Sequence, residues 1–536
     1  MQPFRPFILL FVTGFLIFLL LPAGCTRLGP DFKGIDNPPL PRQWKKNHAP
    51  QDESIISWWR TFNDPALNTL VGKACDGNLD IRGAGLRIAQ ARAVLGISQG
   101  FALPQQQTLS GRAESTHTGL TDFSAVGVNF DMGWELDLWG KYSRGIEAAR
   151  AALYAAVASY DDIMVSIIAE VARNYIGYRT AQERLIYARR NVEIQERVVT
   201  MTEVQFNSGN VSELDMQQAR SQLYSTRASI AAVKIEQVKA ADALALLLGV
   251  DVSEVMDILH EHAGKDEDAG PAFSARRPGV LQLRQSAWKR QGENLIPVPS
   301  LDPKYKIDAD LITRRPDIKV AEYTVHANSA KLGASMADLY PSFSLFGNIG
   351  YNNTDKAGAW LTGTEPLGVS IGPSFSWNIF NYGRIKNRIR LQDAVFEETL
   401  VTYNKAVLAA VAEVKNALSG YVLTLQQQRE NRKALLATIR AFNLSAIQYN
   451  EGLVSYQRLL TTVEKLTLIQ DRFAAIKGKA ALYAVALYKA LGGGWQINRG
   501  RAYISEKTAR RMRKRTDWGT FLDEDMTRIP RGFLHE

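Results

Sequence analysis

The sequence has few of the residues that build covalent frameworks and metal centres. Its 536 residues include two cysteines, Cys25 and Cys75, and six histidines. If Cys25 is modified, Cys75 has no partner in the chain, which excludes a disulfide framework for the mature monomer. Only His260-Glu261-His262 brings two histidines close together, and two ligands on one loop are too few for a zinc site. We therefore expect no metal centre.

Signatures of enzymes are also scarce. The sequence contains no HExxH motif, and we expect no nucleophile elbow. Gly83 and Gly85 lack the preceding strand and the third glycine of a dinucleotide-binding turn. The triple glycine at 492–494 lacks the lysine and serine of a phosphate loop. The prediction is a protein without catalytic residues and without a cofactor other than covalently bound lipid.

Positive charge is too dispersed to indicate a nucleic-acid partner. Lysine and arginine number 64, aspartate and glutamate 54, and the net charge is +10. This excess gathers only near the C-terminus, and no zinc-finger spacing occurs. Within a charged tail at 496–536, the runs Arg510-Arg511 and Arg513-Lys514-Arg515 could contact anionic lipid or peptidoglycan. A solvated, disordered tail is the preferred interpretation.

The first 57 residues indicate an exported, lipid-anchored chain. Arg5 precedes an apolar run at 7–21, which is short for a membrane span but suits the core of a signal peptide. The run ends in Leu21-Pro22-Ala23-Gly24-Cys25, which resembles a bacterial lipobox, although Pro22 stands where leucine is usual. We predict a signal peptide at 1–24, lipid on Cys25 and a proline-rich extended tether at 25–57. An ordinary signal peptide with an incidental cysteine is the alternative.

The most informative feature is internal repetition. Leu95-Gly96 recurs as Leu332-Gly333, 237 residues later, and Trp134 recurs as Trp377, 243 residues later. Other matches keep the same two offsets, which chance would not do over more than a hundred residues. We infer a tandem duplication. It places a first repeat at 58–261, an insertion and linker at 262–312, and a second repeat at 313–495.

Each repeat contains a pattern of period two that predicts a β-hairpin. Residues 126–137 and 369–379 alternate apolar with small or polar side chains. A preceding strand is clear at 343–351 and weak at 109–113. Strands of about ten residues suit a membrane barrel, although a soluble half-buried hairpin remains the alternative. The side chains expected to face lipid are Val128, Phe130, Met132, Trp134, Ile371, Phe375 and Trp377, and those expected to face a polar lumen include Asn129, Asp131 and Ser374.

Helical periodicity follows each hairpin. Long helices are predicted at 140–206 and 212–248 in the first repeat, and at 383–449 and 455–491 in the second. Gly209 and Gly452 lie in the turns, where glycine can take the left-handed conformation. A 65-residue helix is roughly 100 Å long. Shorter helices at 79–101 and 316–340 precede the hairpins.

Four strands cannot close a barrel, so several chains must share one if the hairpins lie in a membrane. Unpaired backbone groups in a bilayer cost several kcal/mol each. Three chains would supply twelve strands and two would supply eight. The long helices are too polar for membrane spans, and hairpins from several chains could continue the barrel as a tube. Such a conduit needs no catalytic residues, and its cargo cannot be read from the sequence.

Several motifs together resemble the TolC-type family of outer-membrane efflux proteins. They are Trp58-Trp59-Arg60, Arg314-Arg315-Pro316-Asp317-Ile318, Trp134-Glu135-Leu136-Asp137-Leu138-Trp139-Gly140, and Tyr449 with Gly452, Val454 and Ser455. The lipoprotein start is similar to that of the NodT-like branch. The resemblance implies an α+β membrane protein in which a trimeric outer-membrane β-barrel, four strands per chain, is continued by a long periplasmic α-helical barrel.

The same resemblance implies partners and sites. The partners are outer-membrane lipid, a periplasmic adaptor and an inner-membrane pump driven by protons. Some relatives carry aspartate rings six and nine residues after the tip glycine. Counting from Gly452, this chain has Arg458 and Thr461 at those positions. Asp215 lies six residues after Gly209, and the preferred interpretation is that it is a solvated helix residue. The residues expected to contact the adaptor are Gly209, Val211, Ser212, Gly452, Val454 and Ser455. A non-transporting structural or adhesive envelope lipoprotein is the alternative function.

Overall fold

The computed structural model describes residues 27–35, 53–118, 121–261, 295–299, 315–355, 360, 366–498 and 500–522. The signal peptide, Cys25 and the insertion after residue 261 lie outside these ranges, apart from residues 295–299. The chain divides into two compact units. Unit 1 comprises Met1–Asp36, Arg87–Val157 and Val320–Lys405, and unit 2 comprises Asn37–Leu86, Ala158–Lys319 and Ala406–Glu536.

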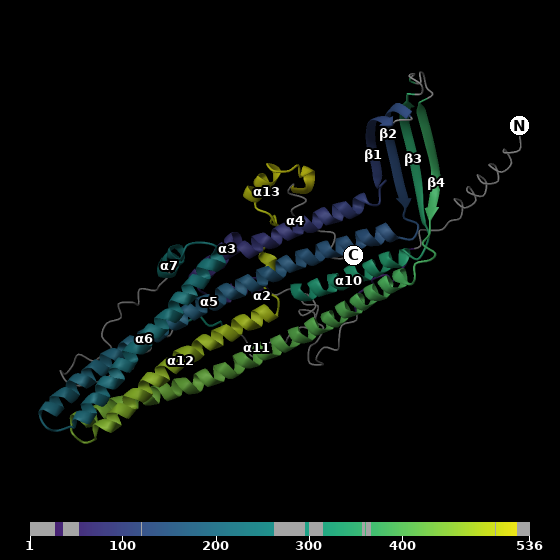
Figure 1. The fold of residues 1–536 in the computed structure, drawn as a ribbon. Helices are drawn as coiled ribbons and strands as arrows, with labels where there is room; N and C mark the ends of the chain where they lie inside the picture. Colours follow the sequence, from purple (N-terminus) through teal and green to yellow (C-terminus); the bar gives the residue numbers. More distant parts are fainter. Residues whose placement is uncertain are drawn as a thin grey trace, which may run out of the picture. The chain divides into compact units, whose positions relative to one another are not determined.

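Unit 1 contains a sheet of four antiparallel strands, β1 (Gln106–Thr118), β2 (Thr121–Leu136), β3 (Ser342–Thr354) and β4 (Leu367–Ser376), in that order (Figure 1). All four predicted strands are present, and β1 and β2 are longer than their patterns indicated. β4 is shorter: Trp377 and Ile379, predicted to belong to it, lie beyond its end. The backbone there turns through left-handed conformations at Tyr382 (φ 50°) and Gly383 (φ 78°) before the next helix begins.

The helices follow the sequence pattern closely. The helix before each hairpin is α4 (Leu79–Gly100) or α10 (Pro316–Ala337). The long helices are α5 (Lys141–Asn207), α6 (Glu213–Leu248), α11 (Arg384–Asn450) and α12 (Tyr456–Ala490), each within a residue of its predicted bounds. Gly209 and Gly452 both have φ of 72°, as the turns require. Both segments of the chain therefore run through the same order of elements: helix, two strands, long helix, helix (Figure 1).

Unit 2 packs the helical hairpins around a core of mainly aliphatic side chains. The short elements α2 (Glu53–Ile56), η1 (Trp58–Phe62) and α3 (Pro65–Gly77) precede α4, and α7 (Val252–Glu261) follows α6. Trp58 is fully buried and stacks on Tyr488 of α12, with 5.2 Å between ring centroids. The Trp-Trp motif near the start of the first repeat therefore anchors the N-terminal segment of this unit to its last long helix.

Two sequence expectations need correction. The tail is not wholly disordered: after η3 (Trp495–Asn498), residues 500–522 form α13 (Glu506–Arg513) and η4 (Gly519–Leu522), with Ala509 and Met512 buried. Amphipathic spacing of these apolar residues explains the order. In addition, α5 and α11 each contain one window long and apolar enough for a membrane span, contrary to the expectation that they are too polar. A helix that is buried on several sides in an assembly also needs such an apolar stretch, because most of its surface is then removed from water.

Candidate functional site

The two faces of the sheet have opposite chemical character. Most of the predicted outward side chains of β2 and β4 are exposed, including Phe130 at 42%, Ile371 at 86% and Phe375 at 72%, whereas Trp134 is half-buried. On the other face, the side-chain amides of Asn129 and Asn352 bond to each other across β2 and β3, with the shorter bond at 2.8 Å. One face is suited to hydrocarbon and the other to water, as in a membrane barrel wall.

Phe346 is an aromatic residue on the polar face that the sequence pattern did not predict. Phe346 of β3 lies opposite Gly133 of β2 and Gly372 of β4, so all three share the polar face. A Cβ on Gly372 would come within 3.3 Å of the Phe346 ring. Gly372 therefore leaves room for this ring, whereas a Cβ on Gly133 would meet Gln106. The small residue at 372 in an otherwise regular alternation is the signal that could have revealed it.

Tryptophans at or just beyond the strand ends bond to the turns that follow α4 and α10, at corresponding places in both segments. The Nε1–H of Trp134 donates to the carbonyl of Ala102 at 3.3 Å, and that of Trp377 donates to the carbonyl of Leu339 at 3.0 Å. Trp139 donates to the carbonyl of Pro341 at 2.8 Å. An indole with one apolar face and one hydrogen-bonding edge suits the boundary between membrane and water. Trp377 thus makes the same kind of contact as Trp134, although it lies outside the strand.

A polar cavity of about 370 Å³ lies where the strands meet the long helices of unit 1. The ammonium of Lys141 is 3.2 Å from a carboxylate oxygen of Asp338 and 3.7 Å from one of Glu135, and Arg388 is 3.7 Å from Asp338. Tyr142 follows Lys141 in the chain, and its pKa is raised mainly by burial and further by the neighbouring Glu135. Carboxylates and cations offset one another here, so the lining provides a hydrated, nearly neutral junction.

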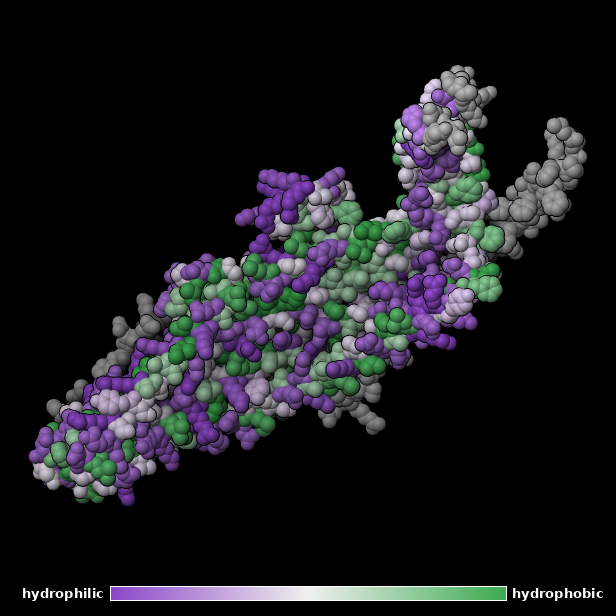
Figure 2. Space-filling model, in the orientation of Figure 1, coloured by the Kyte–Doolittle hydropathy of each residue, from purple (hydrophilic) through white to green (hydrophobic). Residues whose placement is uncertain are grey.

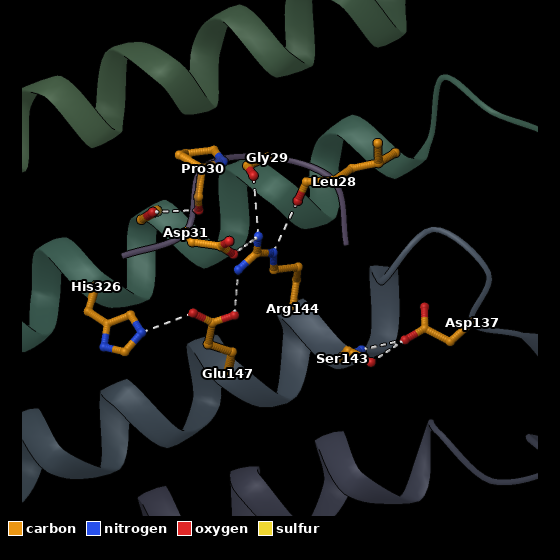
Figure 3. Close-up of polar contacts among 10 residues, drawn as sticks. Leu28, Gly29, Pro30, Asp31, Asp137, Ser143, Arg144, Glu147 and His326 are labelled. Carbon is orange, nitrogen blue, oxygen red and sulfur yellow. Dashed lines mark hydrogen bonds and ion pairs between the residues drawn. The ribbon is translucent and has the colours of Figure 1, made fainter. Parts of the chain in front are cut away.

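The N-terminal tether is held against unit 1 by Arg144, in the first turn of α5 (Figure 3). Arg144 is 1% exposed. Its guanidinium donates to the carbonyls of Leu28 (3.0 Å) and Gly29 (3.3 Å) and to the carboxylate of Asp31 (2.7 Å). Gly333 of α10 permits this approach, because a Cβ there would lie 2.6 Å from the Leu28 carbonyl. The tether was predicted to be extended, and these contacts fix its first residues.

Glu147 and His326 complete this arrangement, and we call Arg144, Glu147 and His326 the tether clamp (Figure 3). Glu147 accepts from Arg144 at 2.8 Å and lies 3.0 Å from Nε2 of His326. The His326 ring stacks on Phe32 of the tether, 4.5 Å between centroids. Burial raises the pKa of Glu147, but its bonds with Arg144 and His326 outweigh burial and lower it. The hydrogen bond and charge of Arg144 also lower the pKa of Asp31.

Sequence reasoning missed the tether clamp because its members come from distant parts of the chain. A signal was present in the repeat: the residues that correspond to Arg144, Glu147 and His326 at the same offsets are Asn387, Arg390 and Ala89. The charge pattern of the two copies differs at all three positions. Such a difference is expected if only one of the two internal repeats performs a function, such as holding the single tether.

The helical tips contain the residues predicted to contact an adaptor. Gly209 and Gly452 are exposed in the turns, and Val211 and Val454 are half-buried. Ser212 caps α6, while the hydroxyl of Ser455 at the corresponding position makes no capping bond. Adaptor contact at these residues stays a prediction.

The residues proposed for an aperture are placed differently from one another. The carboxylate of Asp215 accepts from the backbone N–H (3.1 Å) and the hydroxyl (2.8 Å) of Ser212, so it takes part in the capping box of α6. Arg458 is exposed, and the Thr461 hydroxyl donates to the carbonyl of Gln457 at 2.9 Å. The capping box gives Asp215 a structural role. An aperture role for these residues stays a prediction.

One stretch of the chain matches the sequence pattern of a nucleophile elbow but does not form its structure. Gly96-Ile97-Ser98-Gln99-Gly100 matches the pattern Gly-x-Ser-x-Gly of a nucleophile elbow. This stretch lies within α4, and the Ser98 hydroxyl donates to the carbonyl of Val94 at 3.0 Å. A nucleophile elbow requires a sharp turn between a strand and a helix. Within the described residues, no group of three or more histidine, cysteine, aspartate or glutamate side chains is placed to hold a metal ion.

Comparison with known proteins gives consistent matches. A family model described as outer membrane efflux protein matches residues 70–250 and 309–493. The probable outer membrane lipoprotein SilC of Salmonella typhimurium is 27% identical over 489 residues, which cover 89% of this chain and 97% of SilC. Nodulation protein T of Rhizobium leguminosarum bv. trifolii is 28% identical over 497 residues, 89% of this chain and 96% of that protein. The solved outer-membrane channel OprN has a TM-score of 0.72 at 29% identity and covers 88% of this chain and 100% of its own.

Proposed function

The chain belongs to the outer membrane efflux protein family and is an outer-membrane channel of an efflux system, and we propose that three copies form one duct. In this proposal, each copy supplies β1–β4 to a barrel of twelve strands, and the long helices continue the barrel into the periplasm as a tube. The family comprises channel proteins rather than enzymes, and we propose that this chain conducts passively and catalyses no reaction.

The observation that carries the proposal is the four-stranded sheet with an apolar face exposed and a free edge at each end. β1 and β4 each pair with one neighbour among the described strands. In a bilayer, unpaired edge groups cost several kcal/mol each, so the edges must meet those of other copies. Two copies would give eight strands, and the count of three is the one that the family resemblance implies.

We further propose that a covalent lipid on Cys25 anchors the chain to the outer membrane. The support is the lipobox-like sequence together with the tether clamp, which binds the tether from Leu28 onward. Cys25 lies three residues before Leu28, so the clamp keeps the acylated end close to unit 1, which contains the strands. The name of SilC describes that relative as a probable lipoprotein.

The partners follow from the function. We propose that the tips at 209–212 and 452–455 contact a periplasmic adaptor, which joins the duct to an inner-membrane pump driven by protons. Replacing Val211 and Val454 with tryptophan should abolish export while leaving assembly unchanged. Tryptophan at Thr520, an exposed residue far along the chain from both tips, is the matched control. Export that persists in the double tip variant would refute the adaptor assignment.

The assembly itself is tested by the native mass of the detergent-solubilised protein, corrected for bound detergent. A trimer supports the shared barrel. A stable monomer would leave the strand edges open and would favour the alternative, a structural or adhesive envelope lipoprotein.

A further inference from the structure

The C-terminal residues form a small cationic structure that the shared function does not require. We call residues 500–522 the C-terminal lobe; it includes α13 and η4. The family match ends at residue 493. The lobe therefore lies beyond the part of the chain that the family shares, and its role is not explained by the duct itself.

Specific contacts hold the lobe against the rest of unit 2. A Cβ on Gly85 of α4 would lie 2.1 Å from the Tyr503 carbonyl, so the two backbones approach closely. The Tyr503 ring meets Tyr160 of α5 edge-on, 5.0 Å between centroids. Within the lobe, Arg513 donates to the carbonyl of Leu522 at 2.8 Å. Ile504, Ala509, Met512 and Leu522 are buried. The lobe is thus a docked element rather than a loose tail.

The outward surface of the lobe is strongly basic. It exposes seven cationic side chains against two acidic ones, Glu506 and Asp517, and Figure 2 shows the region around α13 as largely hydrophilic. Glu506 pairs with Arg510 at 2.9 Å, and Asp76 of α3 pairs with Arg501 at 3.3 Å. The mutual repulsion of the other charges costs stability unless an anion offsets it. The seven cationic residues are Arg501, Lys507, Arg510, Arg511, Arg513, Lys514 and Arg515.

This surface does not suit insertion into a membrane or a typical protein interface. A helix that binds a lipid surface buries its apolar face in the bilayer, but Ala509 and Met512 of α13 already face the protein interior. Protein interfaces have apolar cores depleted of charge, whereas Phe521, at 39%, is the large apolar side chain exposed in the lobe. A polymer that carries many separate negative charges matches a patch of fixed cations.

We propose that the C-terminal lobe binds peptidoglycan, through contacts of its arginine and lysine side chains with the carboxylates of the stem peptides. The inference rests on the proposed function, because that function extends the helical unit into the periplasm, where this polymer lies. Arginine forms forked hydrogen bonds with carboxylates, and several such contacts along one polymer add through their high effective concentration. The lobe would fasten the duct to the cell wall.

The test is co-sedimentation of the full-length, detergent-solubilised protein with insoluble peptidoglycan sacculi. Arg511→Glu combined with Lys514→Glu reverses two exposed charges outside the ion pair and the Arg513 contact. We expect this variant to lose roughly tenfold or more of the binding, and binding of the unaltered protein to fall steeply with added salt. Lys234→Glu with Lys239→Glu, on exposed positions of α6, is the matched control and should bind normally.

Competition identifies the source of the negative charge. Soluble muropeptides should displace the protein from sacculi, whereas short-chain phosphatidylglycerol below its micellar concentration should not. The proposal is overturned if the lobe variant sediments like the unaltered protein, if the control loses as much binding, or if the lipid displaces as well as the muropeptides. Native mass is measured on every sample, so that a failure of the trimer is distinguished from a failure of wall binding.

Discussion

A buried ion pair between α5 and α12 provides the sharpest test of the energetics. Lys477 donates to the carboxylate of Glu183 at 3.0 Å, and the two side chains are 7% and 0% exposed. Further along the same helices, Asn191 donates to Gln470 at 2.8 Å. These polar contacts set the register of the two helices within unit 2, because sliding by one residue would separate every pair.

The size of the expected stability change follows from the burial of both charged side chains. Glu183→Leu would remove the carboxylate that offsets the buried Lys477 ammonium, at a cost of about 3–5 kcal/mol in the free energy of unfolding. Lys477→Met would leave a buried carboxylate, at a similar cost. Replacing both, as Glu183→Leu with Lys477→Met, removes both charges together. We expect that double variant to be near neutral or more stable, by up to about 4 kcal/mol.

The assay is thermal unfolding in detergent, followed by far-ultraviolet circular dichroism, as a double-mutant cycle. Glu506→Ala serves as the control, because its pair with Arg510 is exposed and such pairs contribute about 0.2–1 kcal/mol. The reasoning is refuted if either single substitution lowers the melting temperature no more than the control does. It is also refuted if the double variant loses as much as the two single variants combined.

Four further predictions concern other sites. Arg144→Ala should release the tether and so speed tryptic cleavage at Lys33. Arg144→Lys should restore little of the protection, because lysine lacks the forked geometry of the guanidinium. Unchanged cleavage in Arg144→Ala would argue against the tether clamp. The depressed Glu147 pKa adds stability that is full above pH ~4.3 and lost as pH falls through the folded value. Amide hydrogen exchange of residues 28–33, relative to the intrinsic rate at each pH, should therefore speed up in acid, and a flat profile would contradict this. Asp215→Ala should cost about 1 kcal/mol through the lost capping box, seen as faster proteolysis at the first tip, with Thr461→Ala as control. Burial, and to a smaller extent the charge of Asp76, raises the pKa of Cys75 to about 11. The rate of its alkylation should therefore be low at pH 8 and increase with pH. Rapid labelling at pH 8 would contradict this, because it would show that the thiol is accessible.

The regular elements could be predicted because their determinants are local. The long helices contain no proline, and glycines with positive φ end or join them, so their bounds follow from the sequence. The alternation that marks β2 and β3 is equally local. β1 was weak in the pattern because its outward face includes Gly111 and Ser115 rather than large apolar residues, and pairing with β2 defines it instead.

Features that depend on long-range contact could not be predicted. Arg144 binds Leu28, 116 residues earlier in the chain, and nothing in either local sequence indicates the other. The order of the C-terminal lobe likewise depends on Gly85, which offers the Tyr503 carbonyl a place to pack. Asp215 illustrates a different difficulty: family spacing suggested an aperture, while its own neighbour Ser212 gives it a capping role.

The central claim is that neighbouring copies join through strands β1 and β4. It is tested by placing one cysteine in β1, at Ser110, and a second at each position of β4 in turn, from Leu367 to Ser376, in a Cys75→Ser background. Paired strands bring opposite Cβ atoms within disulfide range. The account predicts that oxidation at one register yields a covalently closed trimer. A covalent monomer or dimer as the largest product at every position would contradict it.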